Sequence, residues 1–506
     1  MTSGSRGVAD RPGTLYCGDN LDVLRRHVPD ASVDLVYLDP PFQSGRSYPM
    51  LFELRGRDKA PPPVRAFEDT WRWGPGAEAA HDEVVAAGGR PAAAMLALRQ
   101  LLGESDMLAY LCMMAPRLVE LRRALRKAGS LYLHCDATAS HYLKVLLDAI
   151  FGPACFRNEV IWRYRRWPAA ARQFQKMHDV LLVYSRSEAG EHKFNTLYGY
   201  ERLADSTLKT FGTKRQRADF SSGHRQPGVE DEETLGPPLS DVWEVGVIAA
   251  IAKERLGYPT QKPEALLERV IRASTDEGDT VLDPFCGSGT ALAVAQRLGR
   301  RWIGIDATHL ALGVVRHRLQ AAFGGELDGG VVGEPATVDE ARQLAGEDPR
   351  KLVWWLLGRL GARPEDKKVG RGAGVDGRLL FQDGEGRCAK ARQALVAVES
   401  GRATPARVRA LRKALEQEQA AIGVMLSLEP PTPEAVAAAE EAGDHDGPSG
   451  RVRRVQILSV AEILTGKRVE LPGAPGGGSA PPASGRGPRR LAKTTGAPVV
   501  PARRSG

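Results

Sequence analysis

Strand-like and helix-like segments alternate along this 506-residue chain in two blocks, and this order constrains the fold most strongly. The first block covers residues 14–162, and the second begins at about residue 263. Between them, from about 186 to 255, the periodicity fades and Gly, Pro and charged residues dominate. Alternating strands and helices are typical of a parallel sheet covered by helices on both faces. The sequence therefore predicts an α/β fold with a doubly wound, mostly parallel, Rossmann-like sheet that is interrupted by an insert.

Hydrophobic periodicity assigns the expected elements of these two blocks. The expected strands are residues 14–19, 33–39, 129–136, 179–185, 280–283 and 300–306. The expected helices are residues 105–127, 139–152 and 263–274. Pro116 lies inside the first of these helices, so we expect a kink there or a later start.

The remainder of the chain divides into a linker, a smaller unit and a tail. Residues 324–336 are rich in glycine and predict the linker. The smaller α/β unit is expected over 337–470, with helices at 348–360 and 406–419 and strands at 377–381 and 394–400. Residues 471–506 carry too little apolar surface to bury, so we expect a disordered basic tail.

Composition excludes several classes of protein. No apolar run approaches the roughly 20 residues that span a bilayer. The six cysteines are scattered without a CxxC pair, which favours a reducing, cytoplasmic setting and neither disulfides nor zinc. The formal charge is +8, but the tail holds six basic residues and no acid, which leaves +2 for the rest. Nucleic-acid binding must therefore be argued from local basic patches.

The strand at 33–38 runs into Asp39, Pro40, Pro41 and Phe42. Asp39 and the carbonyl of Pro40 can each accept one hydrogen of an exocyclic amino group, and the prolines hold that carbonyl rigidly. The ring of Phe42 can stack on a flat base. An aromatic amine is a poor nucleophile because its lone pair is delocalised, and holding both hydrogens frees that pair. The motif fits a site for the amino group of a base at the carboxyl edge of the sheet.

A glycine-rich loop, "TVLDPFCGSGTALAVAQ", forms the second motif. It predicts a strand, a tight turn with Gly287 and Gly289, and a helix from Thr290, so that backbone amides can face an anionic group. Asp306 follows Asp283 by 23 residues, about the spacing at which an acid meets ribose hydroxyls. A turn that serves packing alone is the alternative. The loop is not GxGxxG, so NAD is not favoured.

Four segments in this order resemble the amino-group DNA methyltransferases of the beta class. They are "LYCGDNLDVL" at 15–24, the DPPF motif, "YPTQKP" at 258–263 and "DPFCGSGT" at 283–290. The resemblance implies a circularly permuted methyltransferase domain over 14–323, with S-adenosylmethionine as cofactor and double-stranded DNA as substrate. The target base would be flipped out of the duplex. Asp before Pro-Pro resembles the adenine-N6 enzymes more than the cytosine-N4 ones.

The resemblance also implies roles for individual residues. The catalytic set would be Asp39, Pro40, Pro41 and Phe42. The cofactor set would be Asp19, Asp283, Phe285, Gly287, Gly289 and Asp306, with Thr260, Gln261 and Lys262 closing over the methionine end. A plain helix entry at Pro263 is the other interpretation of the last three. No metal ligand is expected.

DNA contacts are expected from basic residues that alternate with aromatic ones. Arg163, Arg165 and Arg166 alternate with Trp162 and Tyr164, and a second basic cluster includes Lys214 and Arg215. Such a mixture suits phosphates and bases, and a solvated basic face is the alternative. We expect the insert, about 163–255, to recognise the DNA target. His134, on a buried strand, is predicted to be a core residue and not a catalytic one.

The C-terminal unit faintly resembles the restriction-endonuclease-like domains that are fused to such methyltransferases. Asp376 occupies the first acidic position of that motif, but Ala397 and Glu399 stand where an acid and a lysine are expected. We therefore expect this unit to position DNA or to serve structurally, without nuclease chemistry.

Other functions stay open at this stage. They are a cytosine-N4 DNA methyltransferase, an RNA or protein amide methyltransferase, and an inactive DNA-binding module. The sequence does not give the recognition site, and it leaves open a homodimer and a separate restriction subunit as partners.

Overall fold

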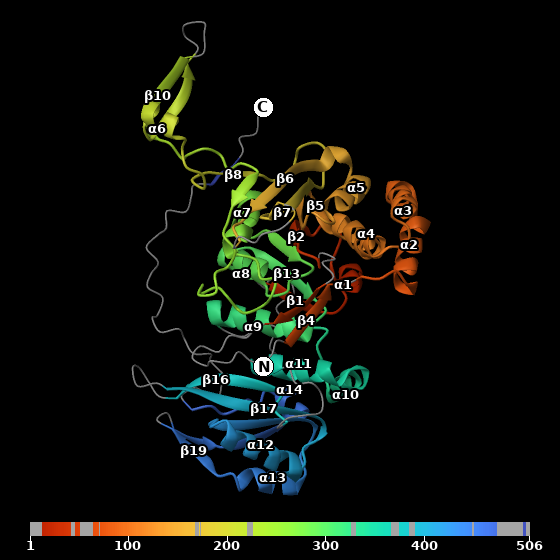
Figure 1. The fold of residues 1–506 in the computed structure, drawn as a ribbon, viewed down its shortest axis with the longest axis vertical. Helices are drawn as coiled ribbons and strands as arrows, with labels where there is room; N and C mark the ends of the chain where they lie inside the picture. Colours follow the sequence, from red (N-terminus) through yellow and green to blue (C-terminus); the bar gives the residue numbers. More distant parts are fainter. Residues whose placement is uncertain are drawn as a thin grey trace, which may run out of the picture.

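The computed structural model describes most of the chain. The described residues are 13–41, 46–50, 64–69, 71–166, 172, 174–219, 226–324, 330–365, 374–383, 390–447, 450–472 and 499–501. Two α/β units are visible in Figure 1, with the C-terminal unit packed beneath helix α9 of the first.

In the described part of the chain, nine strands form the central sheet of the first unit. Their order is β11 (Val242–Glu244), β6 (Phe156–Arg163), β7 (His178–Ser185), β5 (Leu125–Cys135), β2 (Val33–Leu38), β12 (Thr280–Asp283), β13 (Arg301–Asp306), β1 (Gly13–Cys17) and β14 (Val331–Val332). Among these strands, β7 runs antiparallel to both of its neighbours, and every other pairing is parallel. This confirms the predicted mostly parallel sheet.

Helices cover both faces of this sheet. One face carries α1 (Asn20–His27), α4 (Asp106–Ala124) and α5 (Ser140–Phe151), with α2 (Pro75–Ala87) and α3 (Gly89–Leu102) packed outside them. The other carries α7 (Glu264–Ser274), α8 (Thr290–Arg297) and α9 (His309–Phe323). Strand β2 serves both cores, since Val36 and Leu38 face the first and Leu35 and Tyr37 the second. The fold is therefore doubly wound, as predicted.

The insert is smaller than the predicted 163–255, because β7 lies within that range and belongs to the central sheet. The segment that leaves the sheet holds β8 (Asn195–Leu197), α6 (Asp205–Phe211) and the hairpin of β9 (Lys214–Asp219) and β10 (Gln226–Glu233). Figure 1 shows this hairpin projecting far from the body of the unit. The chain then returns as β11 at the edge of the sheet.

The C-terminal unit has a mixed sheet of five strands in its described residues. The strands are β15 (Arg363–Pro364), β16 (Gly377–Asp383), β17 (Lys390–Arg402), β18 (Ile422–Glu429) and β21 (Val455–Ser459). Its helices are α10 (Val338–Glu347), α11 (Pro349–Leu360), α12 (Pro405–Gln417), α13 (Pro433–Glu440) and α14 (Val460–Leu464). A short hairpin joins β19 (Asp444–Gly447) to β20 (Gly450–Arg453). Separate apolar clusters fill the two faces of the sheet, so this unit has its own core.

Three details differ from the sequence-based expectations. The predicted linker contains β14, which pairs with β1 and extends the central sheet. The helix expected over 105–127 ends at Ala124 because β5 begins at Leu125, and it runs as one helix through Pro116. Most of the predicted tail lies outside the described residues, but Leu471 is buried, and β22 (Val499–Pro501) pairs with β8.

Two further strands, β3 (Arg46–Met50) and β4 (Val64–Asp69), form a hairpin after β2.

None of the described helices combines the length and the apolar character needed to cross a membrane.

Candidate active site

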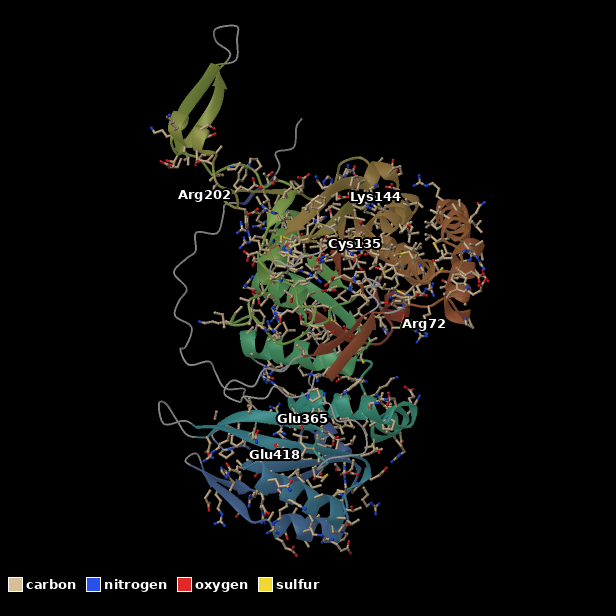
Figure 2. All side chains as sticks on the ribbon, in the orientation of Figure 1. Arg72, Cys135, Lys144, Arg202, Glu365 and Glu418 are labelled. Carbon is tan, nitrogen blue, oxygen red and sulfur yellow. The ribbon has the colours of Figure 1, made fainter. Side chains whose placement is uncertain are left out.

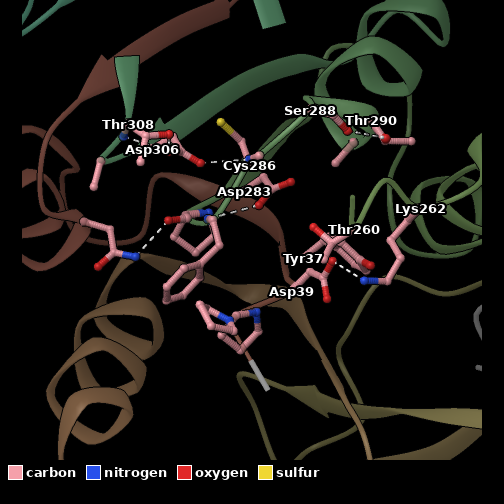
Figure 3. Close-up of a pocket in the computed structure, with 18 of the residues that line it drawn as sticks. Tyr37, Asp39, Thr260, Lys262, Asp283, Cys286, Ser288, Thr290, Asp306 and Thr308 are labelled. Atoms are coloured by element: carbon pink, nitrogen blue, oxygen red, sulfur yellow. Dashed lines mark hydrogen bonds and ion pairs between the residues drawn. The ribbon is translucent and has the colours of Figure 1, made fainter. Parts of the chain in front are cut away.

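A cavity of about 270 Å³ opens at the carboxyl ends of β2, β12 and β13, the edge that the sequence predicts. These strands are neighbours in the sheet, so residues that are far apart in the chain meet here. Figure 3 shows side chains from all three strand ends pointing into one space. Residues with polar side chains in its lining include Asp19, Asp39, Thr260, Lys262, Asp283 and Asp306.

Asp39 is held from two sides. Its Oδ2 accepts a hydrogen bond from the Nζ of Lys262 at 2.5 Å, drawn as a dashed line in Figure 3. Its Oδ1 lies 3.6 Å from the Nδ1 of His134, which is fully buried on β5. The His134 ring also lies 3.1 Å from the hydroxyl of Tyr37 and 3.4 Å from the carboxylate of Asp179. The carboxylate of Asp39 therefore has a fixed orientation at the cavity wall.

The loop after β12 needs both of its glycines. Gly287 and Gly289 have φ of 48° and 70°, which L side chains rarely adopt. A Cβ at Gly287 would lie 3.2 Å from the ring of Tyr258, and one at Gly289 would lie 2.9 Å from Val315. The turn therefore brings backbone close to the cavity and starts α8, whose first residue is Thr290.

Asp306 ends β13 and braces this loop. Its Oδ2 accepts the N–H of Gly287 at 3.0 Å, and its Oδ1 accepts both the N–H and the hydroxyl of Thr308 at 2.9 and 2.8 Å. Burial raises the pKa of Asp306 despite these hydrogen bonds. Each carboxylate oxygen has two lone pairs, so acceptor capacity toward the cavity is left.

Asp283, at the end of β12, is only 3% exposed. Its Oδ1 accepts the N–H of Phe285 at 3.2 Å. Burial raises the pKa of Asp283 well above that of a free aspartate, and the charges of Asp39 and Asp306 act in the same direction. A cation in the cavity would relieve this crowding of acids.

Arg117, Asn20 and Tyr258 are among the lining residues for which the sequence predicted no role. Arg117 on α4 bridges the other side, donating to Asp19 at 2.6 Å and to Asn20 at 2.5 Å. Asn20 in turn donates to the carbonyl of Pro284 at 2.8 Å, which ties α1 to the glycine loop. Tyr258 opens the YPTQKP segment at 258–263, but the resemblance implies no role for it. Asn20 likewise belongs to the segment at 15–24, directly after Asp19, whereas no local pattern marks Arg117, which only the fold brings to the cavity.

Some of the predicted site residues line the cavity and others do not. Most of them line the cavity, including Pro40, Pro41, Phe285 and Thr260. Gln261 does not, because its side chain bonds to backbone groups of Leu256 and Glu254 in its own loop. Gly289 packs behind the loop, and Phe42 lies outside the described residues.

In the segment predicted to contact DNA, the aromatic side chains are buried and the basic side chains are exposed. Trp162 and Tyr164 are buried, at 3% and 4% exposure, so these rings are not free to stack on bases. Arg163, Arg165 and Arg166 are exposed; Arg163 forms an ion pair with Glu244, and the guanidinium of Arg166 lies 4.9 Å from the centre of the Tyr164 ring. Lys214, on the projecting hairpin, is exposed as well, whereas the side chain of Arg215 is not described.

The comparison with protein families identifies the class of protein to which this chain belongs. The N6/N4 DNA methylase family matches residues 33–312, and the chain belongs to it. The cofactor of this family is S-adenosylmethionine, as predicted from the sequence.

Individual relatives match parts of the chain. The type II methyltransferase M2.DpnII of Streptococcus pneumoniae is 55% identical over 86 residues, which are 17% of this chain and 32% of the relative. The DNA adenine methyltransferase YhdJ of Escherichia coli K12 is 28% identical over 312 residues, which are 61% of this chain and 83% of the relative. The chain thus spans about a third of the length of the first relative. A crystal structure of M1.HpyAVI with S-adenosylmethionine is 14% identical, covers 61% of this chain and 98% of its own, and gives a TM-score of 0.34.

The cavity fits this cofactor chemically. S-adenosylmethionine carries a sulfonium and an ammonium against one carboxylate, so its net charge is positive. The lining holds the four carboxyl groups of Asp19, Asp39, Asp283 and Asp306 against the cations Arg117 and Lys262. An acid-rich cavity with a glycine turn that a Cβ would crowd suits a cationic ligand lying close to backbone.

Proposed function

We propose that this protein transfers a methyl group to the exocyclic N6 of adenine in DNA. One observation carries the proposal: Asp39, at the end of β2, lines the same cavity as the glycine loop after β12 and Asp306 after β13. An acceptor for an amino group is thus placed beside the predicted cofactor site. Proximity of this kind supplies much of the rate of a two-substrate reaction.

The residues at the cavity suggest how the amine is activated. S-adenosylmethionine supplies an electrophilic methyl group when it is bound. Lys262 donates a hydrogen bond to one oxygen of Asp39 and fixes the direction of this carboxylate, which can then accept one amino hydrogen. The carbonyl of Pro40, which lines the cavity, would accept the other hydrogen. The nitrogen must lose a proton once the new bond forms, and Asp39 is placed to receive it.

Adenine is favoured over cytosine by two observations. The residue before Pro-Pro is Asp39, which resembles the adenine-N6 enzymes. YhdJ, named a DNA adenine methyltransferase, is 28% identical over 312 residues of alignment. Cytosine-N4 methylation uses the same amino-group chemistry and is the second candidate.

DNA contacts are proposed for two surfaces. Arg165 and Arg166 are exposed beside the sheet edge, and the β9–β10 hairpin projects where it could follow a groove. We propose that the segment from β8 to β10 recognises the target sequence, and that the enzyme acts in the cytoplasm as part of a restriction-modification system.

The test compares Asp39→Ala with Asp30→Ala, which removes an exposed carboxylate that pairs with Arg123. We expect Asp39→Ala to lose methyl transfer to DNA while the affinity for S-adenosylmethionine, measured by calorimetry, changes less than about threefold. Asp30→Ala should keep full activity. Mass spectrometry of digested DNA should detect N6-methyladenine.

Three results would contradict the proposal. Substantial activity of Asp39→Ala would remove the assigned role. Methylation of RNA or protein but not DNA would select another substrate class. No binding of S-adenosylmethionine by the wild type would leave an inactive DNA-binding module.

A further inference from the structure

A second cavity, of about 190 Å³, lies where the two units meet. Helix α9 forms one wall, and α11 with the edge strand β15 and its neighbour β16 forms the other. About 10–15 Å³ of such space holds one water, so the cavity admits a polyatomic ligand. None of its described lining residues is acidic, and six carry or can carry positive charge: Arg255, Arg316, His317, Arg359, Arg363 and Arg378.

Two of these side chains, Arg378 and Arg316, form ion pairs with acids that the structure describes. Arg378 pairs with Glu365 and Glu418, both labelled in Figure 2, where Glu365 lies at the junction of the units. The Nη2 of Arg316 donates to Glu334 at 2.7 Å. The Nη1 of Arg316 is buried and has no hydrogen-bond partner. A buried donor without a partner destabilises the protein, and an acceptor in the cavity would offset this cost.

The remaining cations are crowded. Partial burial lowers the pKa of Arg359, and the charge of Arg316 lowers it further. Burial lowers the pKa of His317, and Arg363 acts in the same direction. These directions mean that the surroundings disfavour positive charge as they stand. A bound anion would instead favour the positively charged forms of these side chains.

The guanidinium donors of this cavity indicate which kind of anion it would bind. Guanidinium groups match phosphate oxygens through pairs of parallel hydrogen bonds, and several around one cavity suit a group with more than one negative charge. Trp354 adds an aromatic surface to the same wall. We propose that this interface cavity binds a phosphate-bearing ligand, with Arg359 and Arg363 among its cationic contacts. This site lies outside the cavity proposed for methyl transfer and does not depend on that function.

The position of the cavity gives such a ligand a structural consequence. Arg255 and Leu256 line it, and Thr260 and Lys262 of the same loop line the methyltransferase cavity. Gln261 braces the loop between them by bonding to Leu256 and Glu254. A ligand at the interface would therefore contact the loop that positions Lys262 against Asp39.

The experiment titrates inorganic pyrophosphate into the full chain by calorimetry at constant ionic strength. We expect the double variant Arg359→Ala, Arg363→Ala to bind at least tenfold more weakly than the wild type. Arg350→Ala is the matched control, because Arg350 lies on the same helix, is 72% exposed and does not line the cavity. It should bind as the wild type does. The single variant Arg359→Gln, which removes the charge but keeps part of the methylene stem and a hydrogen-bond donor, should show a smaller loss of about fivefold and covers the case in which the double variant fails to fold.

A second arm identifies the source of the phosphate. A 20-base-pair duplex is titrated into the same proteins. A parallel loss of duplex affinity in the double variant shows that DNA supplies the phosphate, whereas unchanged duplex affinity shows that the ligand is a free phosphate ester. Absence of pyrophosphate binding by the wild type, or equal binding by wild type and both cavity variants, overturns the proposal.

Discussion

At the scale of single residues, the carboxylate of Asp39 is the best-supported feature of the site. Lys262 holds one oxygen, and His134 lies beside the other. His134 is fully buried, as the sequence predicted for a core residue, yet it also joins Asp39 to Asp179. Burial raises the pKa of Asp179, but its contacts with His134 and the charge of Lys262 outweigh this and lower it. His134 therefore belongs to the core and also contacts the wall of the candidate site through Asp39.

The raised pKa of Asp283 predicts a pH dependence of cofactor binding. A protonated carboxyl does not attract a sulfonium or an ammonium, so affinity for S-adenosylmethionine should rise as pH rises through the elevated pKa. One linked proton changes the affinity by at most about tenfold per pH unit. Calorimetry across pH should show this slope in the wild type and in Asp82→Asn, an exposed carboxylate. The slope should be much reduced in Asp283→Asn, and an equal slope there would assign the dependence to another group.

Local motifs predicted the residues that lie on strand ends, and missed those that arrive from elsewhere. Asp39, Asp283 and Asp306 each end a strand, so a single rule about the carboxyl edge placed them together. Arg117 comes from the middle of α4, where nothing in its neighbourhood marks it. Gln261 belongs to the right motif, but its side chain turns back to its own loop, which spacing does not reveal.

At the scale of elements, the crossing of α9 and α11 joins the two units. Gly313 on α9 and Gly358 on α11 face one another at this crossing. A Cβ on Gly313 would lie 2.9 Å from the Cα of Gly358, which is closer than real Cβ atoms come to backbone. The two helices approach this closely only because neither has a side chain at the contact.

Gly313→Ala should therefore destabilise the protein by about 1–3 kcal/mol, the usual cost of overpacking. Gly346→Ala is the matched control, since Gly346 lies on α10 with open space around its Cβ position. There the better helix propensity of alanine should stabilise by up to about 1 kcal/mol. Urea unfolding followed by circular dichroism measures both. A neutral Gly313→Ala would mean that the helices separate at little cost.

Element prediction succeeded where periodicity was strong and failed where tertiary contacts decide. The helices and strands of the C-terminal unit that were expected at 348–360, 377–381, 394–400 and 406–419 all form, with ends shifted by a few residues. The length of α4 was overestimated because the apolar pattern continues smoothly into β5. The linker region conceals β14, since two valines among glycines give no periodic signal.

At the scale of the whole molecule, the residues at the three nuclease-motif positions bear on whether the C-terminal unit can cut DNA. Asp376 accepts the N–H of Val398 at 2.7 Å, so its carboxylate lies beside the middle of β17. Ala397 is buried, and Glu399 pairs with Arg407 on α12. Across the described residues there is no group of three His, Cys, Asp or Glu side chains that could hold a metal ion.

We expect that the purified protein does not cut unmethylated DNA in the presence of magnesium or manganese. A nuclease of this kind needs clustered metal ligands and a cation near the scissile phosphate. Glu399 places an acid where that cation is expected, and the charge of Arg407 is engaged in an ion pair with it. Gel analysis of plasmid DNA over several hours measures this. Cleavage by the wild type that disappears in Asp376→Ala would show that the unit is a nuclease.

The pairing of β1 has a consequence for how the chain is made. Strand β1 is the first strand of the sheet to leave the ribosome, but its partners β13 and β14 lie near residues 301–306 and 331–332. At about 5–20 residues per second, β1 waits on the order of tens of seconds for its neighbours. During that time its edges are open to wrong pairing, which calls for protection by chaperones. A polypeptide released before residue 306 also lacks one wall of the methyltransferase cavity, so early termination yields no smaller working enzyme.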